Sequence, residues 1–250
     1  MQAPLIELRG VTRTYRVGNR SLAALHAVDL AVGRGEFVAV VGRSGSGKST
    51  LLNILGLLDQ PDSGRYGFGG DDVGRLGRAA RAALRSAAIG FVFQSFNLLA
   101  RSSALENVEL PLVYARMGAA ERRRRANEAL AAVGLAARAQ HWPGQLSGGE
   151  QQRVAIARAI ANDPSVILAD EPTGSLDSGT GLEIMALLQD LNRGGRCIVL
   201  VTHDLAVARH TQRIVSMHDG RIVDDTAVHA PLDARRALHD KGDRHLEAVR

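Results

Sequence analysis

The sequence contains a single cysteine and lacks long hydrophobic runs. One cysteine, Cys197, rules out a disulfide within the chain. Its position in the apolar run CIVLV predicts a buried core thiol and favours a reducing, cytoplasmic setting. The longest apolar stretches, FVAVV and LLNILGLL, are far shorter than the roughly 18 residues needed to span a bilayer. The first residues, MQAPLIELRG, lack a charged segment followed by an apolar core, so we expect no export signal.

The composition is otherwise that of a packed protein, with 45% hydrophobic and 23% charged residues in a chain of 250, which predicts one large domain or a domain with a subdomain. The formal net charge of +5 permits nucleic acid or an anionic membrane surface as a partner. The clearest basic run, RRRR at 122–125, has no interleaved aromatic residues of the kind that a single-strand-binding platform uses. Leu130 and Val133 give the same segment an apolar side, so we interpret the run as the solvated face of a helix.

Hydrophobic patterning predicts alternating strands and helices. Two antiparallel strands are expected at 5–9 and 22–32, around a turn at Gly18-Asn19. Buried strands of a parallel sheet are expected at 36–42, 166–170 and 197–202, with a further strand candidate at 91–93. A hairpin with an Asp-Gly turn is expected at 213–225. Helices are expected at 48–58, through most of 95–160 and at about 179–192. From about 230 the chain is charged and weakly periodic, which predicts a loose helix or disorder. The alternation predicts an α/β core with a parallel sheet, interrupted by an inserted helical subdomain.

The segment GRSGSGKST, residues 42–50, matches the phosphate-loop pattern G-x-x-x-x-G-K-[ST]. It directly follows a predicted buried strand and directly precedes a predicted helix, which is the context that the motif requires. Its glycines would let backbone N–H groups wrap phosphates. Lys48 would reach the β- and γ-phosphates, and Ser49 would ligate Mg²⁺.

Four polar side chains follow other predicted strands. Asp170 and Glu171 end VILADE, His203 follows CIVLVT, and Gln94 follows FVF. Ligands of open α/β sheets bind beyond the carboxyl ends of the strands, so these side chains are candidates for the same site. Asp170 suits the magnesium side, through water, whereas Glu171 suits polarising an attacking water. His203 can donate to a γ-phosphate and sense its loss.

A second helix start, in LSGGEQQRVAIARAI at 146–160, has the features of another anion site. Ser147 is a natural N-cap, and Glu150 completes a capping box. A capping box does not account for Gly148 and Gly149, because each glycine costs about 1 kcal/mol relative to alanine in a helix interior. Helix N-termini with glycine backbones bind phosphates, so the chain has two candidate phosphate sites.

Together these motifs resemble the nucleotide-binding subunits of ABC transporters. The phosphate loop, the glutamine loop FVFQ, the signature LSGGEQQR, the Walker B strand VILADE, the segment SLD at 175–177 and the histidine loop VTHD occur in the family's order, within roughly residues 4–225. The resemblance implies a P-loop NTPase core with a RecA-like parallel sheet, an N-terminal antiparallel β subdomain and an inserted α-helical subdomain. It places the ATPase domain at 1–230 (core 1–94 and 160–230, helical subdomain 95–159) and a charged tail at 231–250.

The resemblance also implies that ATP and Mg²⁺ bind between two copies packed head to tail, with the signature of one copy closing on the γ-phosphate held by the other. Tyr15 matches the aromatic residue that stacks on adenine, and Asp177 matches the aspartate that communicates between the two sites. The implied catalytic residues are Lys48, Gln94, Glu171 and His203, and the implied metal ligands are Ser49, Gln94 and Asp170. The implied nucleotide-binding residues are Tyr15, Gly42, Ser44, Gly45, Ser46, Gly47, Lys48, Ser49, Thr50, Ser147, Gly148, Gly149 and Asp177.

Within the family, STLLNILGLLDQPDSG, FQSFNLLARSSALENVELPLVYA and ILADEPTGSLDS look like the branch of macrolide-type exporters and lipoprotein-release systems. Arg43, Ser175 and the run LLARSS depart from that branch's usual residues. The departures within 95–118 leave the membrane partner open, because that region normally faces the permease. The resemblance implies an ATP-hydrolysing homodimer, peripheral on the cytoplasmic face of the inner membrane, that drives a separate integral membrane permease for export, lipoprotein release or mechanotransmission.

The alternative is a soluble ABC ATPase that acts on nucleic acid. Only the basic net charge favours this alternative. Such proteins carry long coiled coils, zinc modules or a second ATPase half, none of which the sequence contains, so no nucleic acid partner is expected. A degenerate regulatory homologue is not expected either, because Lys48, Asp170, Glu171 and His203 are all present.

Overall fold

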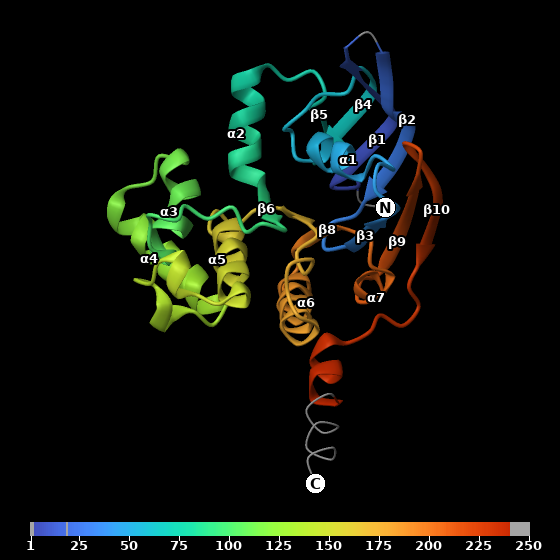
Figure 1. The fold of residues 1–250 in the computed structure, drawn as a ribbon. Coiled ribbons are helices and arrows are strands. Elements are labelled where there is room, and N and C mark those ends of the chain that lie inside the picture. Colours follow the sequence, from blue (N-terminus) through green and yellow to red (C-terminus); the bar gives the residue numbers. More distant parts are fainter. Residues whose placement is uncertain (1–2, 19, 241–250) are drawn as a thin grey trace.

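A computed structural model of the chain describes residues 3–18 and 20–240, and its centre is a six-stranded sheet (Figure 1). The sheet has the order β10–β9–β3–β8–β7–β6, and all neighbouring strands are parallel except β9 and β10. Its strands are β3 (Phe37–Val41), β6 (Ile89–Phe93), β7 (Val166–Asp170), β8 (Cys197–Thr202), β9 (Arg213–His218) and β10 (Arg221–Ala227). The predicted parallel core is confirmed.

The central strands are hydrophobic throughout because both faces of the sheet are covered. In β3, Val38 and Val40 face the core shared with the antiparallel sheet, whereas Phe37 and Ala39 face the core shared with the helices, as the period of two requires. Cys197 is fully buried, as predicted, and burial raises its pKa to about 12.

A four-stranded antiparallel sheet, of order β2–β1–β4–β5, packs beside the central sheet. It contains β1 (Ile6–Val17), β2 (Arg20–Val32), β4 (Ser63–Phe68) and β5 (Asp71–Asp72). The predicted antiparallel pair is confirmed, with a longer first strand; Asn19 of the predicted turn lies outside the described residues. Strand β4 was not predicted, because SGRYGF contains two glycines and has little strand propensity. The strand is stabilised by burial of Tyr66, whose hydroxyl donates to the Leu55 carbonyl at 2.7 Å.

Helix α1 (Lys48–Leu55) begins at the phosphate loop and ends three residues earlier than predicted. Gly56 caps the helix, and Leu57 has a left-handed φ of 55°. A Cβ at Gly56 would lie 2.5 Å from the Phe91 ring, so the close approach of this ring requires glycine at the helix end. The prediction that the helix extends to residue 58 was wrong, because it relied on an apolar run that continues past the turn at Gly56 and Leu57.

The remaining helices form a lobe beside the central sheet or cover its face (Figure 1). The lobe contains α3 (Ala104–Tyr114), α4 (Ala119–Ala132) and α5 (Gly148–Ile160), of which α5 also packs against β6. The other helices are α2 (Arg78–Ala88), α6 (Ser178–Arg193) and the short α7 (Leu205–Ala208). The predicted helical stretch and the helix at 179–192 are confirmed, whereas α2 was not predicted. On α4, Arg124 is exposed and pairs with Glu121 and Glu128, as on a solvated face.

The predicted Asp-Gly hairpin is confirmed, because Asp219 and Gly220 have φ values of 45° and 71°, as a type I′ turn requires. Beyond it, residues 234–240 form a helix that packs on α6. Gln189 Nε2 donates to the Leu232 carbonyl at 2.7 Å, and Ala234 N donates to Gln189 Oε1 at 3.0 Å. The rest of the predicted tail, 241–250, lies outside the described residues. None of the described helices has the length and apolarity that a bilayer crossing requires.

Candidate functional site

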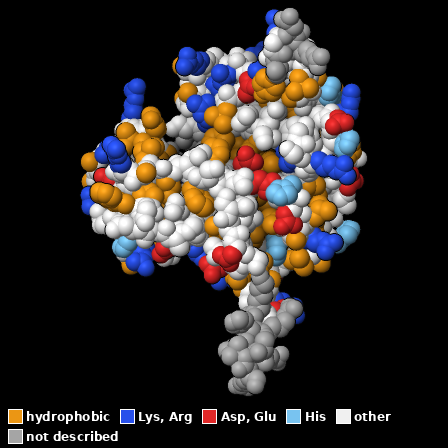
Figure 2. All heavy atoms as spheres, in the orientation of Figure 1, with side chains coloured by type: hydrophobic (Ala, Val, Ile, Leu, Met, Phe, Trp, Pro, Cys, Tyr) orange, Lys and Arg blue, Asp and Glu red, His pale blue; other side chains and the backbone are white. Residues whose placement is uncertain are grey.

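A cavity of about 1200 Å³ opens at the carboxyl ends of the central strands, next to the antiparallel sheet. Figure 2 shows acidic side chains beside a histidine near the middle of this face. Twelve of the predicted site residues line the cavity: Tyr15, Gly42, Ser44, Gly45, Gly47, Lys48, Ser49, Thr50, Gln94, Asp170, Glu171 and His203. The structure therefore brings together residues that are far apart in the sequence.

The phosphate loop has a backbone shape that only glycine tolerates at two points. Gly45 and Gly47 have φ values of 80° and 101°, and a Cβ at Gly47 would lie 2.6 Å from the Ala24 carbonyl oxygen. Ser46, within the loop, is 4% exposed, and its hydroxyl has no hydrogen-bond partner among the described residues. The loop thus presents backbone N–H groups at the start of α1, where the helix dipole favours an anion.

Lys48 is folded over this loop. Its Nζ donates to the carbonyls of Gly42 and Arg43 at 2.7 and 2.9 Å, and the residue is 8% exposed. Neutral carbonyls compensate a buried ammonium group only in part, so an anion bound in the loop would interact strongly with this charge.

The two carboxylates after β7 have different surroundings. Asp170 is half-buried, and burial, followed by the neighbouring charge of Glu171, raises its pKa, while the charge of Lys48 acts in the opposite direction. A carboxylate in this environment favours a bound cation, because a cation would stabilise its charged form. Asp170 therefore has the character expected of a metal-side ligand.

Glu171 is held by three donors. Its Oε2 accepts from the Thr202 hydroxyl at 2.9 Å, and its Oε1 accepts from the His203 backbone N at 2.9 Å and lies 2.6 Å from His203 Nδ1. The backbone of Glu171 has a left-handed φ of 45°, a conformation that costs free energy and is common at functional sites. The His203 side chain is 71% exposed, so it can turn towards a ligand.

Thr202 was missed by the sequence reasoning. It ends β8 and is 1% exposed, and its hydroxyl donates to Glu171 while accepting from Asp204 N at 3.0 Å. The available signal was a hydroxyl at the end of an apolar strand, directly before the candidate His203. Thr202 fixes the orientation of the Glu171 carboxylate.

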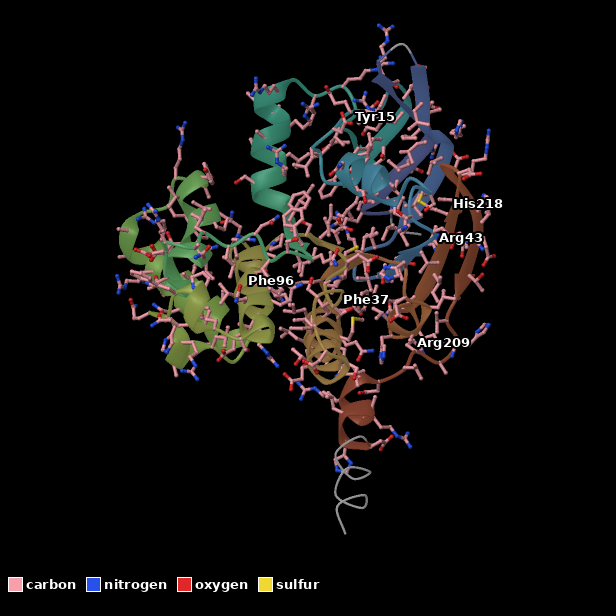
Figure 3. The ribbon with its side chains drawn as sticks, viewed as in Figure 1. Tyr15, Phe37, Arg43, Phe96, Arg209 and His218 are labelled. Atoms are coloured by element: carbon pink, nitrogen blue, oxygen red, sulfur yellow. The ribbon has the colours of Figure 1, made fainter. Side chains whose placement is uncertain are left out.

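Arg158 was missed as well. From α5 it donates to the carbonyls of Phe96 and Asn97 at 2.8 and 2.6 Å, and both of these residues have left-handed φ values, 59° and 50°. Burial lowers the pKa of its guanidinium. Phe96 lies beside α5 (Figure 3), so Arg158 joins the signature helix to the loop that carries Gln94. The available signal was an arginine within the apolar run VAIARAI.

The signature turn lies outside the cavity. Its capping box is confirmed: Ser147 Oγ accepts from Glu150 N at 3.2 Å, and Glu150 Oε2 accepts from Ser147 N at 2.8 Å. A Cβ at Gly149 would lie 2.4 Å from the Thr180 methyl, so packing within the chain accounts for one of the two glycines. Gly148 is exposed and keeps an open backbone at the helix start.

Asp177 also lies outside the residues that line the cavity. It caps α6, because its Oδ1 accepts from Gly179 N at 2.9 Å and Thr180 N at 3.0 Å, and its Oδ2 accepts from the Thr180 hydroxyl at 2.6 Å. The Thr180 hydroxyl is the largest cause that lowers the pKa of Asp177. The carboxylate therefore stabilises the helix start next to the signature turn.

A comparison with protein families identifies the arrangement. The family model described as ABC transporter matches residues 25–174, which include the phosphate loop, Gln94, the signature turn and Glu171. The chain belongs to the ABC transporter family. This ABC cassette is 54% identical over 226 residues to the macrolide export ATP-binding/permease protein MacB of Hyphomonas neptunium. It is 55% identical over 228 residues to MacB of Azoarcus sp.. These matches cover 90% and 91% of the chain but 35% of each relative, so the chain spans about a third of their length.

Solved structures confirm the predicted fold class. The ABC cassette MJ0796, in a dimeric post-hydrolysis state bound to ADP and Pi, matches with a TM-score of 0.82 and 47% identity over 90% of this chain and 99% of that one. A second dimeric structure of MJ0796 matches with the same TM-score and 48% identity. The chain is thus an ABC ATPase cassette that resembles the macrolide-exporter branch.

Proposed function

We propose that this cassette hydrolyses ATP at the interface of a head-to-tail dimer and thereby drives membrane permease subunits. One observation carries the proposal: Ser147 and Gly148 form a helix N-terminus suited to phosphate, yet they lie outside the cavity formed by the phosphate loop of the same chain. A second copy would supply the missing half of each site. The dimeric, ADP- and Pi-bound state of MJ0796 supports this arrangement.

The cavity suits Mg²⁺ and ATP. Ser49, Gln94 and Asp170 line it and offer the oxygen ligands that Mg²⁺ prefers. Residues 3–18 and 20–240 contain no cluster of three His, Cys, Asp or Glu side chains able to hold a metal. Mg²⁺ is usually bound through one or two carboxylates together with substrate phosphates, so nucleotide phosphates would complete the coordination of a cation bound here. Bound Mg²⁺ would neutralise charge on the β- and γ-phosphates, while Lys48 would leave its carbonyl partners for the same oxygens.

Glu171 is the residue that would polarise the attacking water. Thr202 orients its carboxylate, and exposed His203 would move from Glu171 to the γ-phosphate, freeing one carboxylate oxygen for water. Loss of the γ-phosphate would then restore the contact between His203 and Glu171. ATP is a differential ligand, because it would hold the closed dimer and its products would not.

The remaining parts of the proposal concern the membrane. MacB proteins are named as ATP-binding/permease proteins, which supports a permease partner for this cassette at the cytoplasmic face of the inner membrane, with export, lipoprotein release or mechanotransmission as the work done. A groove of about 740 Å³ between α2, α3 and β6, with Leu58, Phe91, Phe93 and Tyr114 among its walls, is the candidate contact surface for the permease.

The proposed division of the chain is a core of residues 1–94 and 160–230, a helical subdomain of residues 95–159 and a tail of residues 231–250.

The dimer is tested with Glu171→Gln, which keeps the site's shape and removes the base. This variant should bind ATP, hydrolyse it very slowly and accumulate as a dimer on size exclusion in the presence of ATP and Mg²⁺. The matched control is Glu171→Gln combined with Lys48→Ala, which should remain monomeric because it lacks the main phosphate-binding cation. A Glu171→Gln protein that stays monomeric at saturating ATP would contradict the proposal.

The role of the signature serine is tested with a matched pair. Ser147 and Ser103 are both N-caps within capping boxes, on α5 and α3, so either change to alanine should lower the free energy of unfolding by about 0.5–2 kcal/mol. Only Ser147→Ala should also weaken the ATP-dependent dimer of Glu171→Gln. Equal dimer formation in both serine variants would refute contact between Ser147 and the partner's nucleotide. Co-purification of a permease from membranes would support the transport assignment, and co-purification of RNA or DNA would contradict it.

A further inference from the structure

Tyr15 is held on two sides by charged groups of its own chain. The Arg13 guanidinium lies over the Tyr15 ring, 4.8 Å from its centroid, and the Tyr15 hydroxyl donates to Asp59 Oδ2 at 2.8 Å. The ring also lines the nucleotide cavity, next to α1 and the antiparallel sheet (Figure 3). One face of the ring and its hydroxyl are therefore occupied, while the half-buried Tyr15 side chain also borders the cavity.

Arg13 itself is fixed by two carboxylates. Its Nη2 lies 2.9 Å from Asp59 Oδ1, and its Nη1 lies 2.7 Å from Asp62 Oδ1. Asp62 Oδ2 in turn accepts from Thr14 N at 2.7 Å, which ties it to β1. The Arg13 side chain is 22% exposed and Asp59 is 26% exposed, so solvent screens this cluster less than it screens a pair on the open surface. A planar guanidinium can satisfy two carboxylates and a ring face at once, which a lysine ammonium cannot.

The cluster connects the antiparallel sheet to the phosphate-binding helix. Asp59 follows the turn at Gly56 and Leu57 that ends α1, and α1 begins with Lys48 at the phosphate loop. The Asp59 carboxylate thus fixes the Tyr15 ring relative to the far end of the helix that binds phosphate. The distance between base and phosphate positions is then set by one rigid helix of eight residues.

We propose that Arg13 and Asp59 are positioning residues for nucleotide binding, which hold the Tyr15 ring so that its other face receives the base. This inference rests on the proposed function, in which Tyr15 stacks on adenine. Arg13 covers the face opposite the base, and Asp59 prevents the ring from turning about its Cα–Cβ bond. Stacking is then available without the ordering of a mobile ring, which would otherwise weaken binding.

The test measures kcat and the KM for ATP of the full chain, with inorganic tripolyphosphate as a competitive inhibitor that has phosphates but no base. Tyr15→Ala should raise KM by about 5- to 100-fold, the range expected for loss of one base–aromatic stack. Arg13→Gln and Asp59→Asn should each raise KM by about 3- to 10-fold and change kcat less than twofold, while Arg13→Lys should recover part of the loss. Tripolyphosphate should inhibit all of these variants as it inhibits the wild type, because the phosphate site is unchanged.

Arg16→Gln is the matched control, because it removes the same charge from an exposed position one residue beyond Tyr15. Its KM should equal that of the wild type. If Tyr15→Ala raises KM and the Arg13 and Asp59 variants do not, the positioning role is wrong. An equal loss of tripolyphosphate binding in those variants would also overturn it, since the damage would then be structural. If Tyr15→Ala itself leaves KM unchanged, the adenine assignment within the proposed function is wrong.

Discussion

Replacement of Gly149 by alanine is predicted to destabilise the fold, because the Thr180 side chain leaves no room for a Cβ at this position. An alanine Cβ at position 149 would lie 2.4 Å from the Thr180 methyl, about 1 Å closer than ordinary contact. Thr180 is β-branched and its hydroxyl is bonded to Asp177, so the methyl cannot easily rotate away. Overpacking of this kind costs about 1–3 kcal/mol, partly offset by the higher helix propensity of alanine. For a chain of this size the unfolding temperature should fall by roughly 2–10 °C.

The assay is thermal and urea unfolding of Gly149→Ala, Thr180→Ser and the double variant. Thr180→Ser removes the methyl and keeps the hydroxyl that Asp177 accepts from, so Gly149→Ala should be neutral or stabilising in that background. The control is Gly148→Ala, whose Cβ would meet only side-chain ends, Leu176 Cδ2 at 3.3 Å and Phe96 Cζ at 3.9 Å, and which should change stability by less than about 0.5 kcal/mol. A Gly149→Ala protein as stable as the wild type, or one that Thr180→Ser does not rescue, would refute the packing argument.

Three further predictions concern the cavity. Lys48→Ala should lose most ATP affinity because the main phosphate cation is gone; unchanged affinity by calorimetry would contradict that assignment. Thr202→Val should lower kcat by about 10-fold or more, since a hydrogen bond to a charged group contributes about 1.5–3 kcal/mol, and Thr202→Ser should restore it. Burial raises the pKa of Asp170 in the folded, nucleotide-free protein above its value in the unfolded chain. The free energy of unfolding is therefore lowered at pH values where Asp170 is ionised in the folded state. Asp170→Asn should therefore unfold at higher urea than the wild type at pH 7 without Mg²⁺, and the difference should vanish below about pH 4, where the unfolded carboxyl is protonated; a difference independent of pH would contradict the argument.

The central strands and the last hairpin could be predicted because local sequence decides them. FVAVV and CIVLVT are apolar at every position, which fits a strand covered on both faces. Asp219-Gly220, which follows RIVSMH and precedes RIV, favours a type I′ turn because both residues tolerate positive φ. Phosphate-loop residues were predictable for a similar reason, since the strand, glycines, lysine and helix are adjacent in the chain.

Features that depend on distant packing could not be predicted. The Phe91 ring, 35 positions beyond Gly56, leaves no room for a Cβ at the end of α1, and Thr180 on another helix leaves none at Gly149. Arg158 gave only the weak signal of a charge in an apolar run, because its carbonyl partners lie about 60 residues earlier. Local propensity carries no information about such contacts. The contact between Tyr15 and Asp59 is another that could not be predicted for this reason.

The central claim is that each ATP is bound by the phosphate loop of one copy and the signature turn of another. A crystal structure of Glu171→Gln with ATP and Mg²⁺ tests this claim most directly. It should show a dimer in which Ser147 Oγ and Gly148 N of one copy lie within hydrogen-bonding distance of the γ-phosphate that Lys48 of the other copy holds. A structure in which Ser147 instead contacts the nucleotide bound to Lys48 of its own chain, or in which the signature turn touches no phosphate, would contradict the account.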